Sequence, residues 1–443
     1  MDRTDLSITL IHKIFNYIDK DFKLLIHNEN STIDERSKKL KIETIMRAGL
    51  EEHFKDLLLL PRFKKSMGIH WKSSLCIRAA RGGFLNTLKW ARKNGCDWSW
   101  STCAAAAEGG SLDCLKWARR NGCDWSEETC HAAAKEGKLD CLIWAQQNGC
   151  KCGESVSYYA AENGQLDCLI WLHENGCTMS SGTCRWAACG GQLSCLQYLH
   201  SIQCPMDSYT CRSAAEHGQL HCLIWLHENG CEWSSICTEA AAKEGHLDCL
   251  IWARERGCDW NAKTCAEAAK GGQLACLVWA REHGCDWDSD TCANAAEGGH
   301  LECLVWAREH GCNWNAKTCS AAAKKGHLNC LIWAKEHGCS FDKTCTEAAA
   351  EGGHLDCLIW AREHGCDWCF KTCKAAAGGG HLDCLVWARQ HGCKWSKDIC
   401  RIAAKEGKLD CLIWAVNNGC KWDKAYCIQI GRRNIIDWIL STE

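Results

Sequence analysis

Small and apolar residues recur along this chain in a pattern that repeats every 27 residues. Each copy has a short alanine-rich stretch, a break containing glycine, and a second run with apolar residues at helical spacing, as in residues 264–287. A fixed period of this length predicts stacked supersecondary units, because no single unit can bury its apolar face alone. A cysteine in the second run marks the period at Cys114, Cys141, Cys168, Cys195, Cys222, Cys249, Cys276, Cys303, Cys330, Cys357, Cys384 and Cys411.

Each copy of the repeat predicts two helices. We expect Thr264 to cap the N-terminus of the first helix, with Glu267 three residues later completing a capping box. Apolar residues from Leu274 onward have the spacing of a second helix, and Gly284 is expected to end it in the left-handed conformation. With about 14 copies, the sequence predicts an all-α fold, an α-solenoid of stacked helix-turn-helix repeats over residues 71–443.

The core of the repeat resembles the ankyrin repeat. Residues 268–287 follow the ankyrin pattern AAxxGHLExVxxLLExGADVN in register, and His246 and His300 supply its Gly-His-Leu turn in other copies. The Thr-Pro-Leu-His start of ankyrin repeats is replaced by Thr-Cys or Ile-Cys, and the period is 27 residues, where ankyrin repeats have about 33. The resemblance covers roughly residues 74–440. It implies ankyrin-like stacking without projecting β-hairpin fingers, in a short-repeat variant similar to arrays of large DNA viruses and protists.

The resemblance also implies a function. Ankyrin-like arrays are non-enzymatic scaffolds for protein–protein interaction, so we expect one or more protein partners and no cofactor. Catalytic motifs such as Gly-x-Ser-x-Gly, the P-loop and His-Glu-x-x-His do not occur in the sequence. No catalytic, cofactor-binding or metal-binding residue is therefore predicted.

The first 70 residues differ from the rest of the chain, because they contain neither cysteine nor the repeat. Leu6, Leu10 and Ile14 share one helical face, so residues 1–70 are predicted to form an N-terminal helical cap or adaptor. Residues 6–19 resemble the opening helix of an F-box, although its usual proline is missing. A second hypothesis for the protein is therefore an F-box-type substrate receptor for a ubiquitin ligase.

Charge and hydropathy exclude several classes of function. The net charge of −2 gives no basic surface for nucleic acid. No segment has the 18 or so continuous apolar residues of a membrane span, and the N-terminus lacks the layout of a signal peptide. We therefore expect a monomer that binds neither nucleic acid nor membrane and is intracellular, in the cytoplasm or nucleus, or in a host cell if viral.

The chain has 41 cysteines, most of them in three ladders, at Thr-Cys, Asp-Cys-Leu and Gly-Cys. Successive rungs of one ladder should lie about 8–10 Å apart. A disulfide needs Cα atoms within about 7 Å, so only pairs between different ladders remain possible. Inside cells we expect reduced thiols that act as small buried hydrophobes. A third hypothesis is a metal-binding or redox-responsive cysteine-rich protein, whose best zinc candidate is the Cys-x-x-Cys of Cys366 and Cys369.

Tryptophan and histidine also recur at fixed positions of the repeat, and we expect both to have structural roles. The tryptophans of the second helices, such as Trp279, are predicted to bridge neighbouring repeats and contribute buried area. Histidines that precede the glycine at the end of that helix, such as His283, are predicted to lie at the helix C-terminus.

The two positions after each Ala-Ala pair change charge from repeat to repeat, while the flanking Ala, Leu and Trp residues scarcely change. In ankyrin-like stacks these positions lie on the concave side, so we expect them to face solvent and contact the partner. The alternative is a merely solvated face. The predicted partner-binding residues are Lys243, Glu244, Lys270, Glu297, Lys324, Lys325, Glu351, Lys405 and Glu406.

Overall fold

The structure is a computed structural model that describes residues 71–369, 371–395 and 398–441. The N-terminal cap or adaptor predicted over residues 1–70, with its resemblance to an F-box, lies outside the described residues. The part of the chain that the structure describes consists of helices, turns and connecting segments and contains no strand. The all-α prediction is confirmed.

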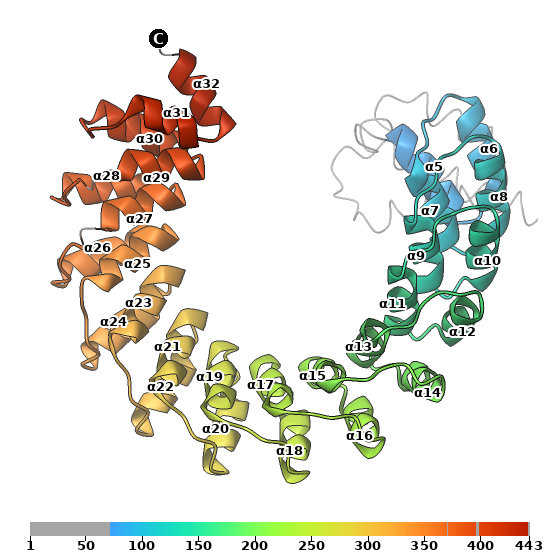
Figure 1. The fold of residues 1–443 in the computed structure, drawn as a ribbon, viewed down its shortest axis with the longest axis horizontal. Coiled ribbons are helices and arrows are strands. Elements are labelled where there is room, and N and C mark those ends of the chain that lie inside the picture. Colours follow the sequence, from blue (N-terminus) through green and yellow to red (C-terminus); the bar gives the residue numbers. More distant parts are fainter. Residues whose placement is uncertain (1–70, 370, 396–397, 442–443) are drawn as a thin grey trace, which may run out of the picture. The chain divides into compact units, whose positions relative to one another are not determined.

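The described helices form consecutive pairs, each with an odd-numbered first helix and an even-numbered second helix (Figure 1). The first helices are α5 (Trp71–Arg81), α7 (Trp100–Glu108), α9 (Glu128–Lys135), α11 (Ser155–Glu162), α13 (Ser181–Cys189), α15 (Ser208–Glu216), α17 (Ser235–Glu244), α19 (Ala262–Lys270), α21 (Ser289–Gly298), α23 (Ala316–Lys325), α25 (Thr344–Gly352), α27 (Thr372–Gly379), α29 (Ile399–Glu406) and α31 (Lys424–Ile430). The second helices are α6 (Leu85–Lys93), α8 (Leu112–Arg120), α10 (Leu139–Gln147), α12 (Leu166–Glu174), α14 (Leu193–Ser201), α16 (Leu220–Glu228), α18 (Leu247–Glu255), α20 (Leu274–Glu282), α22 (Leu301–Glu309), α24 (Leu328–Glu336), α26 (Leu355–Glu363), α28 (Leu382–Gln390), α30 (Leu409–Asn417) and α32 (Arg433–Ser441).

The chain divides into two compact units between Cys152 and Gly153. Helices α5 to α10 belong to the first unit and α11 to α32 to the second. Within each unit, each second helix packs on its own first helix, and the first helices of successive pairs pack on one another. This is a solenoid of stacked helix-turn-helix pairs, as the sequence predicts.

The core of the stack uses the same few residue types in most pairs, although the last pair, α31 and α32, buries Cys427, Ile435 and Ile439. In the pair α19 and α20, Ala268 and Ala269 of the first helix and Leu277 of the second are fully buried. The small alanine side chains allow neighbouring first helices to approach closely, and the leucines fill the space beside them. All cysteines except Cys152, Cys177 and Cys189 are buried, which confirms the prediction that most of them are core residues.

Helix α19 begins three residues earlier than expected, so the prediction that Thr264 is the N-cap is wrong. Helix α19 begins at Ala262, and the side chain of Asn261 accepts a hydrogen bond from the backbone N–H of Lys263 at 2.8 Å. Thr264 is instead the third helical residue, whose hydroxyl accepts from the backbone N–H of Asn261 at 3.5 Å. The capping box therefore joins Asn261 and Thr264 and does not involve Glu267.

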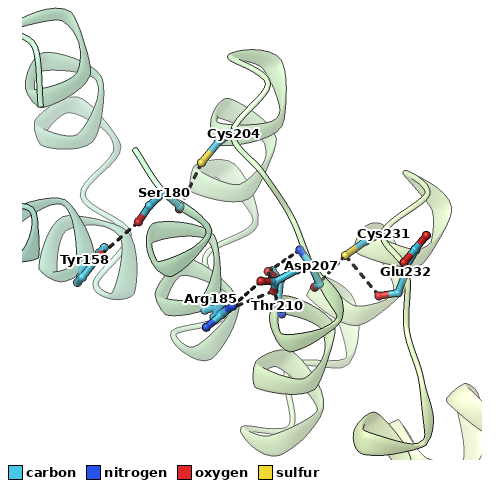
Figure 2. Close-up of polar contacts among 8 residues, drawn as sticks. All are labelled: Tyr158, Ser180, Arg185, Cys204, Asp207, Thr210, Cys231 and Glu232. Carbon is cyan, nitrogen blue, oxygen red and sulfur yellow. Dashed lines mark hydrogen bonds and ion pairs between the residues drawn. The ribbon is translucent and has the colours of Figure 1, made fainter. Parts of the chain in front are cut away.

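The same exchange recurs at α15. Asp207 accepts a hydrogen bond from the backbone N–H of Thr210 at 3.1 Å, and the Thr210 hydroxyl accepts from the backbone N–H of Asp207 at 3.3 Å (Figure 2). Asp207 also forms an ion pair with Arg185 of the preceding first helix, α13. Partial burial raises the pKa of Asp207, but hydrogen bonds from Arg185 and Thr210 outweigh it and hold that pKa below its usual range. This start of α15 therefore ties two neighbouring pairs together.

The second helices end as expected. Gly284 has a φ of +86° and follows the last residues of α20 in the left-handed region. Gln203 holds the equivalent place after α14 and has a φ of 59°, the one positive φ among the described residues that are not glycine. The left-handed conformation costs a side-chain-bearing residue about 1–2 kcal/mol. This pair therefore retains the backbone of its neighbours at a cost in stability.

Candidate interaction surface

The nine predicted partner-binding residues lie at the C-terminal ends of the first helices α17, α19, α21, α23, α25 and α29. Each is exposed or half-buried, while the alanines that precede it are buried. We call this set the charged row. It places one or two charged side chains at the same point of each of these helices, as the 27-residue period predicts, whereas α27 has Gly378 and Gly379 there. The prediction that these residues bind a partner stays a prediction.

Several members of the charged row bind one another. Lys270 Nζ lies 3.3 Å from Glu297 Oε2, and Lys324 Nζ lies 2.8 Å from Glu351 Oε1. Each of these ion pairs joins two neighbouring first helices. Lys243 contacts its own neighbour Glu244 at 2.8 Å, and that hydrogen bond raises the pKa of Lys243.

The end of the charged row also contains an ion pair, in which Arg432 lies 3.9 Å from Glu406. Side chains this exposed form pairs that contribute at most about 1 kcal/mol each to stability. The change of charge from repeat to repeat is thus partly explained by pairing between neighbours. Among the ion pairs of the described residues, none involves Lys325 or Lys405, so these two ammonium groups are the members best placed to bind a partner's carboxylates.

The histidines of the Gly-His-Leu turn, such as His300 and His327, form a second row beside the charged row. The imidazole of His300 lies against Gly272 of the preceding pair, where a Cβ on Gly272 would be 2.4 Å from His300 Nδ1. Gly299 and His327 repeat the contact one pair further along. The glycine is therefore required twice over, by its positive φ and by the ring above it. The recurrence of Gly-His or Gly-Gln in the sequence is the signal of this contact.

We expect the stability of the second unit to depend on pH through His327. Burial lowers the pKa of His327, a hydrogen bond to the backbone of Glu297 raises it, and electrostatic interactions with His300, His354 and Lys325 lower it further. The unfolded chain therefore takes up this proton first as pH falls. Stability is fully present above the ordinary pKa of 6.5 and is lost as pH falls through the lower folded value.

The variant His327→Gln tests this dependence, because Gln273 occupies the same place two pairs earlier. Thermal unfolding of both proteins should give similar midpoints near pH 7.5, where the histidine is neutral. Between about pH 7 and pH 5 the midpoint of the variant should fall less steeply than that of the unchanged protein. Parallel pH profiles would show that His327 does not contribute.

The tryptophan ladder bridges neighbouring pairs, as predicted. Trp260, in the segment after α18, contacts Trp279 of α20 edge-on with ring centroids 5.7 Å apart. His283 stacks on Trp279 at 4.4 Å, and its Nδ1 donates to the backbone oxygen of Trp279 at 2.8 Å. Asn121 donates to the equivalent oxygen of Trp117 at the same distance, which explains why histidine and asparagine alternate at this helix end.

Sequence reasoning missed the role of the arginines on the second helices. Arg281 places its guanidinium 4.7 Å from the ring centroid of Trp287 and donates to the backbone oxygen of Cys285 at 3.1 Å. The same pair of contacts recurs at Arg254 and Arg308. The regular spacing of six residues between arginine and tryptophan is the signal that could have revealed it.

The cysteines after the second helices do more than fill the core. Cys285 donates its thiol hydrogen to the backbone oxygen of Asn261, the N-cap of its own pair, at 3.3 Å. Cys204 and Cys231 bind the oxygens of Ser180 and Asp207 at the same distance, as Figure 2 shows. In these pairs the thiol therefore links the end of the second helix to the start of the first helix, which valine or leucine could not do.

The two thiols of the Cys-x-x-Cys motif contact different groups. Cys366 donates to the backbone oxygen of Asp342 at 2.8 Å, whereas Cys369 donates to the Glu347 carboxylate at 3.0 Å. Within the described ranges, no group of three or more His, Cys, Asp or Glu side chains is arranged to hold a metal ion. This part of the chain offers no completed zinc site around the motif.

No family model and no curated protein matches this chain. Among solved structures, it is similar to the ankyrin repeat domain of human ASB11, with 21% sequence identity. That match covers 35% of this chain and 84% of the other, with a TM-score of 0.31. Of the helices described above, none is long and apolar enough to span a membrane.

Proposed function

We propose that the protein is a non-enzymatic scaffold that binds another protein through the charged row. Repeats of the ankyrin type typically serve in protein–protein interaction, because a stack of pairs presents one extended surface. The observation that carries the proposal is the contrast within each pair: the buried Ala, Cys and Leu positions stay the same, while the exposed row beside them changes charge.

The geometry favours a partner with acidic side chains at the C-terminal part of the row. Lys270 and Lys324 would have to give up their carboxylate partners, Glu297 and Glu351, to bind another protein. The loss of these ion pairs reduces the net free energy gained on binding. Lys325 and Lys405 take part in no ion pair among the described residues and would need no such exchange. Complementary charge at these two positions would set specificity and association rate more than total affinity.

The test is a comparison of two doubly substituted full-length proteins. Lys325→Glu with Lys405→Glu reverses the two available charges of the row. Lys394→Glu with Lys421→Glu makes the same change of charge at two exposed lysines in the segments after α28 and α30. Arginines of the second helices are unsuitable controls, because they pack on tryptophan rings.

Each protein is used to capture binding partners from lysate of cells that express it, and the affinity for each captured protein is then measured. We expect the substitutions in the charged row to lower the affinity for the specific partner about tenfold, which corresponds to roughly 1.4 kcal/mol of binding free energy. The control variant should have the same affinity as the unchanged protein. Circular dichroism should be the same for all three proteins. Equal affinities for both variants, with the fold intact, would mean that a partner uses another face.

A further inference from the structure

We propose that Cys184 and Cys204 form a reversible disulfide when a hydroperoxide enters the surface pocket beside Cys204. Cys184 lies near the start of α13, and Cys204 follows the end of α14, so the bond would close one helix pair on itself. The Cys184 thiol donates to the Cys204 sulfur at a distance of 3.4 Å. A disulfide bond is about 2.05 Å long, so a small rotation of the two side chains brings the sulfurs within bonding distance.

A surface pocket makes this cysteine pair accessible to small molecules in solvent. The cavity has a volume of about 400 Å³ and is lined by the segments that follow α12 and α14. Cys204, Gln203 and Pro205 form one side of it, and Cys177 and Met179 form the other. Cys204 is 8% exposed, while Cys184 behind it is fully buried. A small oxidant in the pocket therefore reaches Cys204 before Cys184.

The pocket belongs to the irregular part of the repeat array. Gln203 and Met206 stand where the pair α19 and α20 has Gly284 and Trp287. In that regular pair, Cys265 and Cys285 hold the two equivalent positions, and both are fully buried. Trp287 there lies beneath the guanidinium of Arg281. The equivalent thiols thus occur in a covered setting at Cys285 and in an accessible setting at Cys204, which predicts that Cys204 is oxidised before Cys285.

The hydrogen bond from Cys184 also prepares Cys204 for reaction. It lowers the pKa of Cys204 by stabilising the thiolate, against the opposing effect of burial. The Cys204 thiolate attacks one oxygen of hydrogen peroxide, the O–O bond breaks, and the departing hydroxide takes up a proton to become water. Cys204 is then a sulfenic acid.

Cys184 completes the reaction. Its sulfur attacks the sulfur of the Cys204 sulfenic acid, the S–O bond breaks, and the hydroxide leaves with the proton of the Cys184 thiol as a second water. The two thiols together lose two electrons and two protons, and the peroxide is reduced to two molecules of water. A dithiol reductant reverses the change by thiol–disulfide exchange.

The disulfide should stabilise the helix pair that contains Gln203. The bond links the start of α13 to the residue after Gln203, whose left-handed backbone carries a conformational cost. A cross-link of this kind removes freedom mainly from the opened state. Backbone amides of α14 should therefore exchange their hydrogens at least about tenfold more slowly in the oxidised protein than in the reduced one.

The experiment uses the reduced full-length protein and a titration with hydrogen peroxide. Remaining thiols are alkylated, the protein is digested, and the peptides are analysed by mass spectrometry. We expect a cross-linked peptide containing Cys184 and Cys204, lighter by about 2 Da than the sum of its reduced parts, to form at the lowest peroxide concentrations. Dithiothreitol should remove it, and Cys265 and Cys285 should remain thiols.

Two variants separate the steps of the reaction. With Cys184→Ala, the oxidation of Cys204 should stop at the sulfenic acid, which dimedone traps as a stable adduct. With Cys265→Ala, a matched change in the regular pair, the link between Cys184 and Cys204 should form as before. The measurement on the unchanged protein decides the matter if a variant does not fold.

Three results would overturn the proposal. One is a cross-link between Cys265 and Cys285 at the same peroxide concentration as that between Cys184 and Cys204. Another is a link from Cys204 to Cys177 across the pocket in place of Cys184. The third is a Cys204 that stays reduced when Cys177, on the same pocket, has already been oxidised.

Discussion

The variant Leu277→Ala should lose about 3 kcal/mol of unfolding free energy. Leu277 lies in α20 and is fully buried. This helix packs on α19 of its own pair and on the neighbouring second helices α18 and α22. Truncation to alanine removes apolar surface from the core and leaves a cavity that the rigid stack can fill only in part.

Urea denaturation measures the effect and its spread along the chain. Repeats are coupled only to their neighbours, so a cavity in one pair should weaken the cooperation between the pairs on its two sides. We expect a lower midpoint and a broader transition in Leu277→Ala. Glu282→Ala, at an exposed position of the same helix, should change stability by less than about 0.5 kcal/mol. Equal shifts of midpoint in the two variants would contradict a core role for Leu277.

The helix pairs could be predicted from the sequence because the information that determines them is local. Each pair is specified within 27 residues by alanines, a turn with glycine, a leucine-containing helix and a final glycine. Gly284 has the left-handed backbone that its position predicts. Even where Gln203 replaces glycine, the backbone stays left-handed, since the neighbouring pairs and the hydrogen bond of Cys204 hold that segment in place.

The first turn of α19 could not be placed with the same certainty, because two residues of this repeat are able to cap it. Thr264 has a hydroxyl suited to an N-cap, and so has the side chain of Asn261 three residues earlier. Packing decides between them. Thr264 is fully buried, so it lies inside the stack, and Asn261 takes the extended backbone of the N-cap.

The charged row shows the other limit of sequence reasoning. Variation in charge at fixed positions predicts exposed side chains, and the structure places them at exposed or half-buried positions. The partner of each charge depends on which residues the stacking brings together. Lys270 and Glu297 are 27 positions apart in sequence, and only the contact between α19 and α21 places their charged atoms 3.3 Å apart. The pocket beside Cys204 likewise needs two consecutive pairs to form its walls.

The stacking of first helices can be tested with a single buried charge. Ala295 lies in α21, which packs between α19 and α23, and its side chain is fully buried. We expect Ala295→Asp to lose about 3–5 kcal/mol of unfolding free energy at pH 7, the cost of a buried charge without a partner. Glu297, only two residues further on, is half-exposed and binds Lys270, so a carboxylate is tolerated once it leaves the interface.

The pH dependence of the Ala295→Asp variant distinguishes the effect of the introduced charge from the effect of the larger side chain. Burial raises the pKa of the introduced carboxyl in the folded protein above its value in the unfolded chain. The folded protein therefore binds the proton first as pH falls, and the loss of stability in Ala295→Asp should be largest above the folded pKa and should shrink in acid. Ala295→Asn has nearly the same volume and no charge, so its loss should be smaller at pH 7 and should not shrink in this way. Urea midpoints measured from pH 7 down to pH 4 compare the two variants, each referred to the unchanged protein at the same pH. If Asp and Asn destabilise equally at every pH, crowding between α19, α21 and α23 limits substitution at this interface, and desolvation of the charge contributes little.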